Sequence, residues 1–321
     1  MNSAPFRYAA IDIGSNTFHL LIAELTRDKG LKIIRDIQRP TRLSASLQQK
    51  GGLESEAINR SLKTLEEFCD ICRRLEAKEV RAVGTSALRR AANASQFLQQ
   101  AKQKCQLEVE VISGFQEAEL VLKAVFYDYS LRVGRSLIAD IGGGSTEFIF
   151  IKEGKVEEVK SLSLGSVDLT EQFFPGDKAT KAQCSALGKV VKQKLKLLPA
   201  MDVSPKMISL GGTATCLGSL ALGLRQYSAE KVDGITLDIE KIADIIEILQ
   251  GLSVTERIHR LGLQPLRADI ILAGAIIQQK IMEKYGIKSC QISAKGVRYG
   301  LLLKMLEENG ITITKHHFSI I

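Results

Sequence analysis

Apolar residues are grouped along this chain in short runs of strand length, separated by longer stretches in which apolar residues recur every three or four positions. The short runs are typical of buried β-strands and the recurring spacing of amphipathic helices. Strands that alternate with helices in this way predict an α/β fold. We expect the elements in this order: strands 8–13, 18–25 and 31–37, helix 55–78, strand 80–83, helix 86–104, strand 108–112, helix 116–127, strands 136–141, 147–152 and 156–164, and helices 178–197, 239–251, 266–285 and 300–309.

One strand, turn and strand pattern occurs twice in the chain, near the start and near the middle. In each copy an apolar run delivers an Asp at the strand end, Asp12 or Asp140, and a second apolar run begins at Phe18 or Phe148. The repeat suggests duplicated halves. Small and polar residues form the two turns: Gly14, Ser15, Asn16 and Thr17 in the first, and Gly142, Gly143, Gly144, Ser145 and Thr146, followed by Glu147, in the second.

Each turn alone is compatible with a plain β-hairpin, because Gly and Ser are common turn residues. Taken as a pair, the turns indicate phosphate binding, since small residues let the backbone approach a ligand and aim N–H groups at anionic oxygens. A carboxylate beside such a cradle suits Mg²⁺, which is usually held by one or two carboxylates and bridges to substrate phosphates. Neither a P-loop nor a Rossmann glycine spacing is present.

Three further segments are candidates, each with a structural alternative. Arg89 and Arg90 lie at the start of a predicted helix, either as a solvated pair or with a guanidinium that binds phosphate. Glu117 opens another predicted helix, where an acid is favoured by the helix dipole whether or not it is catalytic. Gly212 and Thr213 follow an apolar run at a helix start, which is either an ordinary helix N-terminus or an anion site.

Composition sets the class of protein. A chain of 321 residues with 45% hydrophobic content can bury a large core and should divide into two domains. The longest apolar stretch, 270–277, is too short to span a bilayer, and we expect a cytoplasmic protein. Cys69 and Cys72 fall on the apolar face of a predicted helix, which indicates a core position instead of a zinc or redox site.

The net charge of +8 favours polyanionic partners. Aromatic residues make up only 5% of the chain and Trp is absent, so single-stranded nucleic acid, which needs stacking rings, is not the expected partner. A phosphate-rich small molecule or polymer fits better. Among the histidines, His19 lies within an apolar strand and is expected to be a core or sheet-face residue.

At these positions the chain resembles the exopolyphosphatase/guanosine pentaphosphate phosphohydrolase family, in a short form without the C-terminal helical domains of longer members. The resemblance implies a duplicated actin-like, ribonuclease H-like two-domain α/β fold with an interdomain cleft. Two positions differ from the family pattern. Gln116 stands where members often have an acidic residue just before the catalytic Glu, and Ala294 stands where some members have Asp. The matching segments span essentially the whole chain: 12–19, 84–89, 112–114, 117–118, 140–147, 174–176, 212–213, 267–269 and 296–300.

The resemblance also implies roles for the candidate residues. Glu117 would position or deprotonate the attacking water, and Arg89 would bind phosphate. Asp12, Asp140 and Glu147 would organise Mg²⁺, and the glycine-bearing turns would cradle phosphates. We expect domain I to comprise 1–124 and the C-terminal segment 305–321, and domain II to comprise 125–304, with Asp12 and Asp140 facing one another across the cleft.

The expected activity is release of terminal orthophosphate from inorganic polyphosphate, guanosine pentaphosphate, or both, without nucleic acid or membrane partners. A homodimer is compatible with this reading. An ATP-dependent kinase or ATPase of the same fold is the nearest alternative, because the paired turns do not distinguish them. A non-catalytic sensor of polyphosphate or alarmone is another, although Glu117, Asp12 and Asp140 are all present.

Overall fold

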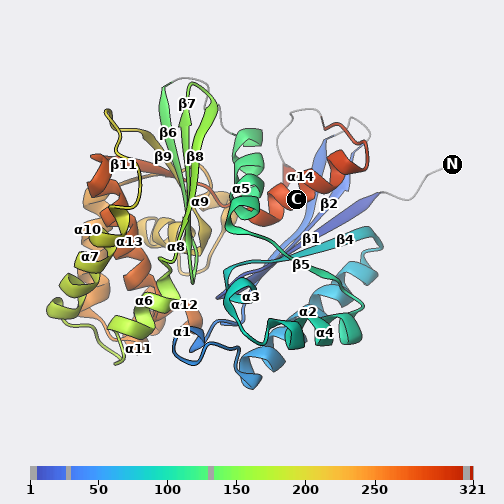
Figure 1. The fold of residues 1–321 in the computed structure, drawn as a ribbon, viewed down its shortest axis with the longest axis horizontal. Coiled ribbons are helices and arrows are strands. Elements are labelled where there is room, and N and C mark those ends of the chain that lie inside the picture. Colours follow the sequence, from blue (N-terminus) through green and yellow to red (C-terminus); the bar gives the residue numbers. More distant parts are fainter. Residues whose placement is uncertain (1–5, 27–29, 129–133, 314–318, 321) are drawn as a thin grey trace. The chain divides into compact units, whose positions relative to one another are not determined.

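The computed structural model describes residues 6–26, 30–128, 134–313 and 319–320. The chain divides into two compact units, each with its own six-stranded mixed sheet and its own hydrophobic core (Figure 1). Unit 1 comprises residues 1–129 and 296–321, and unit 2 comprises residues 130–295. The predicted class of α/β protein with two sheets is therefore observed.

In unit 1 the strand order is β12-β3-β2-β1-β4-β5. The amphipathic helix α2 buries its apolar stripe, including Cys69 and Cys72, against this sheet's core, which confirms the predicted core position of both thiols. The elements of unit 1 are β1 (Arg7–Ile13), β2 (Thr17–Leu25), β3 (Leu31–Pro40), α1 (Leu47–Lys50), α2 (Ser55–Arg74), β4 (Ala77–Gly84), α3 (Ser86–Arg90), α4 (Ala94–Cys105), β5 (Val109–Val111), α5 (Gly114–Asp128), α14 (Val297–Glu308) and β12 (Ser319–Ile320).

In unit 2 the strand order is β10-β11-β9-β6-β7-β8. The apolar helix α13 is buried on nearly all sides at the centre of this unit. The elements of unit 2 are β6 (Arg135–Ile141), β7 (Thr146–Lys152), β8 (Lys155–Leu162), α6 (Ser166–Phe173), α7 (Lys181–Leu195), β9 (Lys206–Leu210), α8 (Gly211–Ala221), α9 (Ala229–Val232), β10 (Thr236–Asp238), α10 (Ile239–Gly251), α11 (Val254–Leu261), α12 (Pro265–Ala268), α13 (Ile271–Tyr285) and β11 (Ser289–Ile292).

The two sheets repeat one arrangement around their first strand. In unit 1, β1 forms an antiparallel hairpin with β2 and pairs in parallel with β4. In unit 2, β6 forms the same hairpin with β7 and pairs in parallel with β9. Because parallel strands end at the same edge, each glycine turn lies beside the loop that follows the neighbouring strand. Ligands of open α/β sheets bind at this edge.

Two predicted helices are interrupted. The segment 86–104 forms α3 and α4 with a break that ends at Asn93, whose side chain accepts from the Leu53 N–H (2.7 Å) and donates to the Leu53 carbonyl (3.0 Å). In the same segment the Ala92 N–H donates to the Gly51 carbonyl (3.0 Å) and not to a carbonyl of its own helix, which interrupts the helix. The segment 266–285 forms α12 and α13, and Pro265 occupies the first turn of α12, where a missing N–H costs nothing. Among the described residues, the sequence also did not predict α1, α6, α9, α11, β10, β11 and β12.

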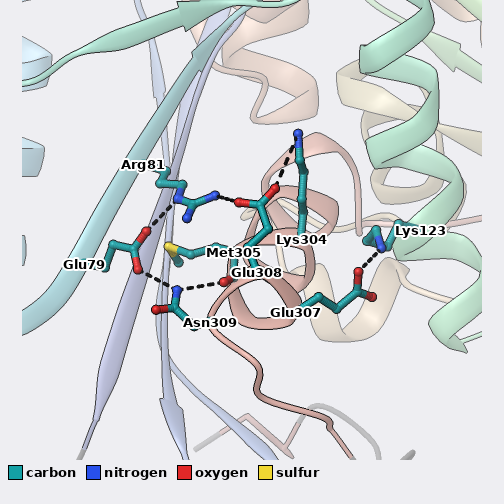
Figure 2. A network of polar contacts seen from close by, with 8 residues as sticks. All are labelled: Glu79, Arg81, Lys123, Lys304, Met305, Glu307, Glu308 and Asn309. Atoms are coloured by element: carbon teal, nitrogen blue, oxygen red, sulfur yellow. Dashed lines mark hydrogen bonds and ion pairs between the residues drawn. The ribbon is translucent and has the colours of Figure 1, made fainter.

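The C-terminal helix α14 is held to unit 1 by a polar network (Figure 2). Arg81 of β4 pairs with Glu79 (2.6 Å) and with Glu308 at the end of α14, while Lys123 of α5 pairs with Glu307 (2.5 Å). Asn309 donates to Glu79 (2.7 Å). Since exposed ion pairs contribute little singly, the network chiefly fixes the register of this returning helix.

The start of α14 is anchored in unit 1 as well. Arg298 binds Asp36 of β3 through two bonds (2.8 and 2.9 Å), and the Tyr299 hydroxyl donates to the same carboxylate. Burial acts to raise the pKa of Asp36, but Arg298, Tyr299 and His19 together outweigh it and hold that pKa below its ordinary value. A Cβ on Gly300 would lie 1.8 Å from the Leu120 carbonyl oxygen, so only Gly permits this approach of α14 to α5.

These contacts bear on the predicted domain boundaries. We expected domain I to be 1–124 with 305–321 and domain II to be 125–304. Those boundaries fall inside α5 and α14, whereas both helices belong whole to unit 1. The physical reason is the close packing of α14 on α5 and its bonds to β3, which no local pattern reveals. In the part of the chain that the structure describes, no helix is long and apolar enough to cross a membrane.

Candidate active site

The first glycine turn joins β1 to β2 in unit 1. A Cβ on Gly14 would lie 2.7 Å from the Thr17 carbonyl oxygen, so the turn is too tight for any larger residue without a shift. The Asn16 carbonyl accepts from the N–H groups of Thr41 and Arg42, both at 2.9 Å, and the Ser15 carbonyl accepts from Ser44 at 3.0 Å. These bonds hold the buried turn in one conformation against the loop after β3.

The second glycine turn joins β6 to β7 in unit 2 and closes with a bond from the Gly142 N–H to the Ser145 carbonyl (2.9 Å). The start of α6 supports it, because Ser166 and Val167 donate backbone bonds to Gly142 and Gly143. Both turns therefore have carbonyl oxygens engaged by neighbouring backbone. This pre-organises them, as a phosphate cradle requires.

Gly165 makes this support possible. It has an extended backbone, and a Cβ there would lie 2.2 Å from the Gly143 carbonyl oxygen and 2.4 Å from the Gly144 Cα. We expect Gly165→Ala to displace the turn and to lower the free energy of unfolding by about 1–3 kcal/mol, as overpacking typically does. Urea unfolding measures this. Gly176→Ala is the matched control, because a Cβ at Gly176 meets nothing within 4 Å; equal stability of the two variants would contradict the prediction.

Two carboxylates lie side by side next to the second turn. Asp140 and Glu147 are directly paired across β6 and β7, so their side chains project to the same face of the sheet. Glu147 is 2% exposed and accepts from the Ser145 and Ser161 hydroxyls at 2.9 and 2.8 Å. In unit 1 the corresponding pair is Asp12 and His19.

This donor set fits Mg²⁺ in unit 2. The ion is usually held by one or two carboxylates and retains several waters, and Asp140 and Glu147 supply two oxygen-bearing groups that would repel each other without a cation. Gly211 has φ of 84°, and a Cβ there would lie 2.4 Å from Asp140 Oδ1. The Asp140 carboxylate thus packs against bare backbone, which fixes its orientation.

The N-terminus of α8 lies at the same edge of the unit 2 sheet, directly after β9. A Cβ on Gly212 would lie 2.1 Å from Arg267 Nη1, so this guanidinium rests on the glycine backbone. Thr213 is 2% exposed and packs on Gly274 of α13. The charge of Asp269 acts on this guanidinium. The arrangement is therefore compatible with both alternatives for Gly212 and Thr213, an ordinary helix N-terminus or an anion site.

Glu117 and Arg89 form a buried ion pair at the corresponding edge of unit 1. Arg89 Nη1 donates to Glu117 Oε2 at 2.6 Å and to the Ile112 carbonyl at 2.9 Å. The Glu117 side chain is only 10% exposed. Burial raises the pKa of Glu117 above its ordinary value, and Arg89 opposes that change without cancelling it.

The position of Glu117 is set by the cap of α5. Ser113 and Gln116 form reciprocal bonds, from the Ser113 N–H to Gln116 Oε1 (2.8 Å) and from the Gln116 N–H to Ser113 Oγ (3.2 Å). This is the geometry of a capping box. The amide of Gln116 therefore takes a structural role directly before Glu117.

The structure brings the predicted residues together within each unit. In unit 1 the 14–17 turn, Arg89 and Glu117 follow β1, β4 and β5, which are adjacent parallel strands. In unit 2 Asp140, Glu147, the 142–146 turn and Gly212 follow β6 and β9. The supporting residues Gly165 and Ser166 were not predicted as part of the site, although they form a Gly-Ser pair at a helix start.

Comparison with known proteins agrees with this description. A model of the Ppx/GppA phosphatase family matches residues 21–309. The guanosine-5'-triphosphate,3'-diphosphate pyrophosphatase of Vibrio vulnificus is 32% identical over 305 residues, which are 94% of this chain and 59% of that protein. The chain therefore spans less than two thirds of the length of this curated relative.

Solved structures show the same architecture. A Ppx/GppA family member from Aquifex aeolicus is 35% identical with a TM-score of 0.77, over 95% of this chain and 99% of that one. An exopolyphosphatase from Cytophaga hutchinsonii is 25% identical with a TM-score of 0.85, over 97% and 100% of the two chains. The predicted actin-like, two-domain fold class is confirmed by these neighbours.

Proposed function

The chain belongs to the Ppx/GppA phosphatase family, and from this premise we propose that it is a Mg²⁺-dependent phosphohydrolase that releases terminal orthophosphate from inorganic polyphosphate, guanosine pentaphosphate, or both. The observation that carries the proposal is the buried Arg89–Glu117 pair. Its carboxyl group has a raised pKa and lies at the ligand-binding edge of the unit 1 sheet. Perturbed carboxyl groups at such edges are candidates for general bases.

In the proposed reaction Glu117 accepts a proton from water as the water oxygen bonds to the terminal phosphorus. The bridging P–O bond breaks, and its electron pair goes to the shortened chain. A raised pKa makes Glu117 a stronger base than an ordinary carboxylate. Arg89 keeps the carboxylate directed by its 2.6 Å bond, and because a guanidinium has five N–H donors, it is able to bind a phosphate oxygen as well.

The remaining residues would neutralise and position the phosphates. Asp140 and Glu147, together with Asp12, would hold Mg²⁺, which supplies charge neutralisation on the phosphate oxygens when bound. The N–H groups of both turns and the Gly212–Thr213 helix start, with Arg267 beside it, would bind the neighbouring phosphates. Catalysis of phosphoryl transfer depends mainly on such positioning and charge stabilisation.

The pH dependence of turnover tests the role of Arg89. Activity requires the Glu117 carboxylate, so kcat should fall as pH drops through the raised pKa, with a midpoint above the ordinary value of 4.5. Because Arg89 lowers that pKa, Arg89→Gln should move the midpoint to higher pH. Arg74→Gln, on the exposed end of α2, is the control for net charge. If the fall of kcat at low pH has the same midpoint in Arg89→Gln as in the native protein, Glu117 is not the group whose titration limits activity.

Substrate assays separate the proposal from its alternatives. We expect Mg²⁺-dependent phosphate release from polyphosphate or guanosine pentaphosphate that exceeds release from ATP. Phosphate transfer from ATP to an acceptor would indicate a kinase of the same fold. Tight binding of polyphosphate or alarmone with no turnover would indicate a sensor.

A further inference from the structure

A groove lined with lysines lies between the C-terminal ends of α7 and α13 in unit 2. These two helices pack against one another (Figure 1). The groove has a volume of about 330 Å³, and its floor includes the buried Leu195. The other lining residues are charged: Lys192, Lys196, Lys280, Glu283 and Lys284.

The lysines form two rows. Lys192 and Lys196 are four residues apart on and just after α7, and Lys280 and Lys284 are four residues apart on α13, so each pair shares one helix face. One carboxylate, Glu283, lies between the rows and pairs with Lys192 (3.3 Å) and with Lys280. Four cations and one anion leave a formal charge of +3 on the lining.

Helix dipoles do not account for this charge. Cations are commonly found at helix C-termini because each end carries roughly −0.5 of an elementary charge. Two helix ends together offset about one positive charge, so about two remain. Among the described residues, neither Lys196 nor Lys284 forms an ion pair with a carboxylate.

Lys284 is the more constrained of these two. Its ammonium lies 5.1 Å from the centre of the Tyr285 ring. Partial burial lowers the pKa of this lysine, although the residue as a whole is exposed. The groove therefore has a surplus of positive charge that nothing on its own walls neutralises.

We propose that this groove binds a segment of a linear polyphosphate chain. Lysine binds phosphate as a point charge without demanding one orientation, and two rows of lysines suit a flexible chain with a charge on every unit. The lining has no aromatic side chain to stack bases. This inference deepens the proposed function by assigning a second contact for long substrates, apart from the glycine turns.

The test is binding of long-chain polyphosphate to the Lys192→Gln, Lys196→Gln, Lys284→Gln triple variant of the whole chain. Binding is measured in chelator, without turnover, so its outcome does not depend on hydrolysis. A control triple variant, Lys155→Gln, Lys231→Gln, Lys241→Gln, changes net charge equally at exposed positions of unit 2 outside the groove.

Losing three phosphate contacts should reduce the slope of log Kd against log salt by about 2, and should weaken binding about 10- to 100-fold at 0.1 M salt. The control should bind nearly as the native protein does. Glu283→Gln should tighten polyphosphate binding, because it removes the groove's carboxylate. If the groove residues only stabilised the fold, losing the ion pairs of Glu283 would weaken binding instead. In turnover assays KM for long chains should rise, while KM for inorganic triphosphate and kcat stay unchanged.

Equal binding by the groove and control variants would overturn the proposal. So would an equal rise in KM for inorganic triphosphate, because the effect would then act through the reaction site. Groove-dependent binding of anionic lipid vesicles, with polyphosphate binding unaffected, would assign the lysines to a membrane surface instead. If the protein hydrolyses no polyphosphate but its binding of polyphosphate still depends on the groove lysines, the proposed function is contradicted and the groove proposal is supported.

Discussion

Replacing Glu117 with Gln should lower kcat for phosphate release by about 10²–10⁴-fold, the range expected when a general base is lost. The amide keeps the size and much of the hydrogen bonding of the carboxylate but cannot accept the proton. Substrate binding should survive. Burial disfavours the charged form of Glu117, so removing the charge offsets part of the loss of its bond to Arg89, and the melting temperature should stay close to that of the native protein.

The matched control is Glu119→Gln, which makes the same chemical change two residues away on the exposed face of α5. A purely structural role for Glu117 predicts a different outcome, in which loss of its ion pair with Arg89 lowers the melting temperature and leaves turnover near normal. kcat, polyphosphate affinity and melting temperature measured on both variants decide between them. A folded Glu117→Gln protein with near-native kcat would leave water activation to another group, such as Glu147.

Asp140→Asn should abolish stimulation by Mg²⁺ and lower kcat by about 10²–10³-fold, comparable to losing one pre-organised electrostatic contact. The side chain keeps its shape against Gly211, so the fold should be retained. Titration of Mg²⁺ against phosphate release, with chelator as the baseline, measures the effect. Asp244→Asn, at an exposed position of α10, is the control.

A metal role for Asp140 would be contradicted by full activity of the native protein in excess chelator. It would also be contradicted by unchanged Mg²⁺ stimulation in Asp140→Asn. Glu147→Gln should show the same defect if both carboxylates hold the ion, because the two are cross-strand partners.

Local sequence was sufficient to predict the two hairpins and their turns. Apolar runs that end in Asp and resume after small residues specify a strand, a turn and a strand without reference to the rest of the chain. The register of β6 and β7 then pairs Asp140 with Glu147, which follows from the spacing once the hairpin forms. Prediction of the fold class also required the repetition of this hairpin and the family resemblance.

Features that depend on distant partners could not be predicted. The bond from Arg89 to Glu117 joins residues 28 positions apart on separate helices, and spacing alone left both residues with structural alternatives. The break after α3 depends on backbone and side-chain bonds to a distant loop, from Ala92 to Gly51 and from Asn93 to Leu53. The place of α14 in unit 1 depends on Gly300, Asp36 and the network of Figure 2, so the predicted boundaries divided α5 and α14.

The most direct test of the proposed chemistry is phosphate release in isotopically labelled water. Polyphosphate and guanosine pentaphosphate are incubated with the protein and Mg²⁺, and the label is located by mass spectrometry. If water attacks the terminal phosphorus, the released orthophosphate carries one labelled oxygen and the shortened chain carries none. Label in the shortened product, or transfer of an unlabelled phosphoryl group to an acceptor, would contradict hydrolysis at the terminal phosphate.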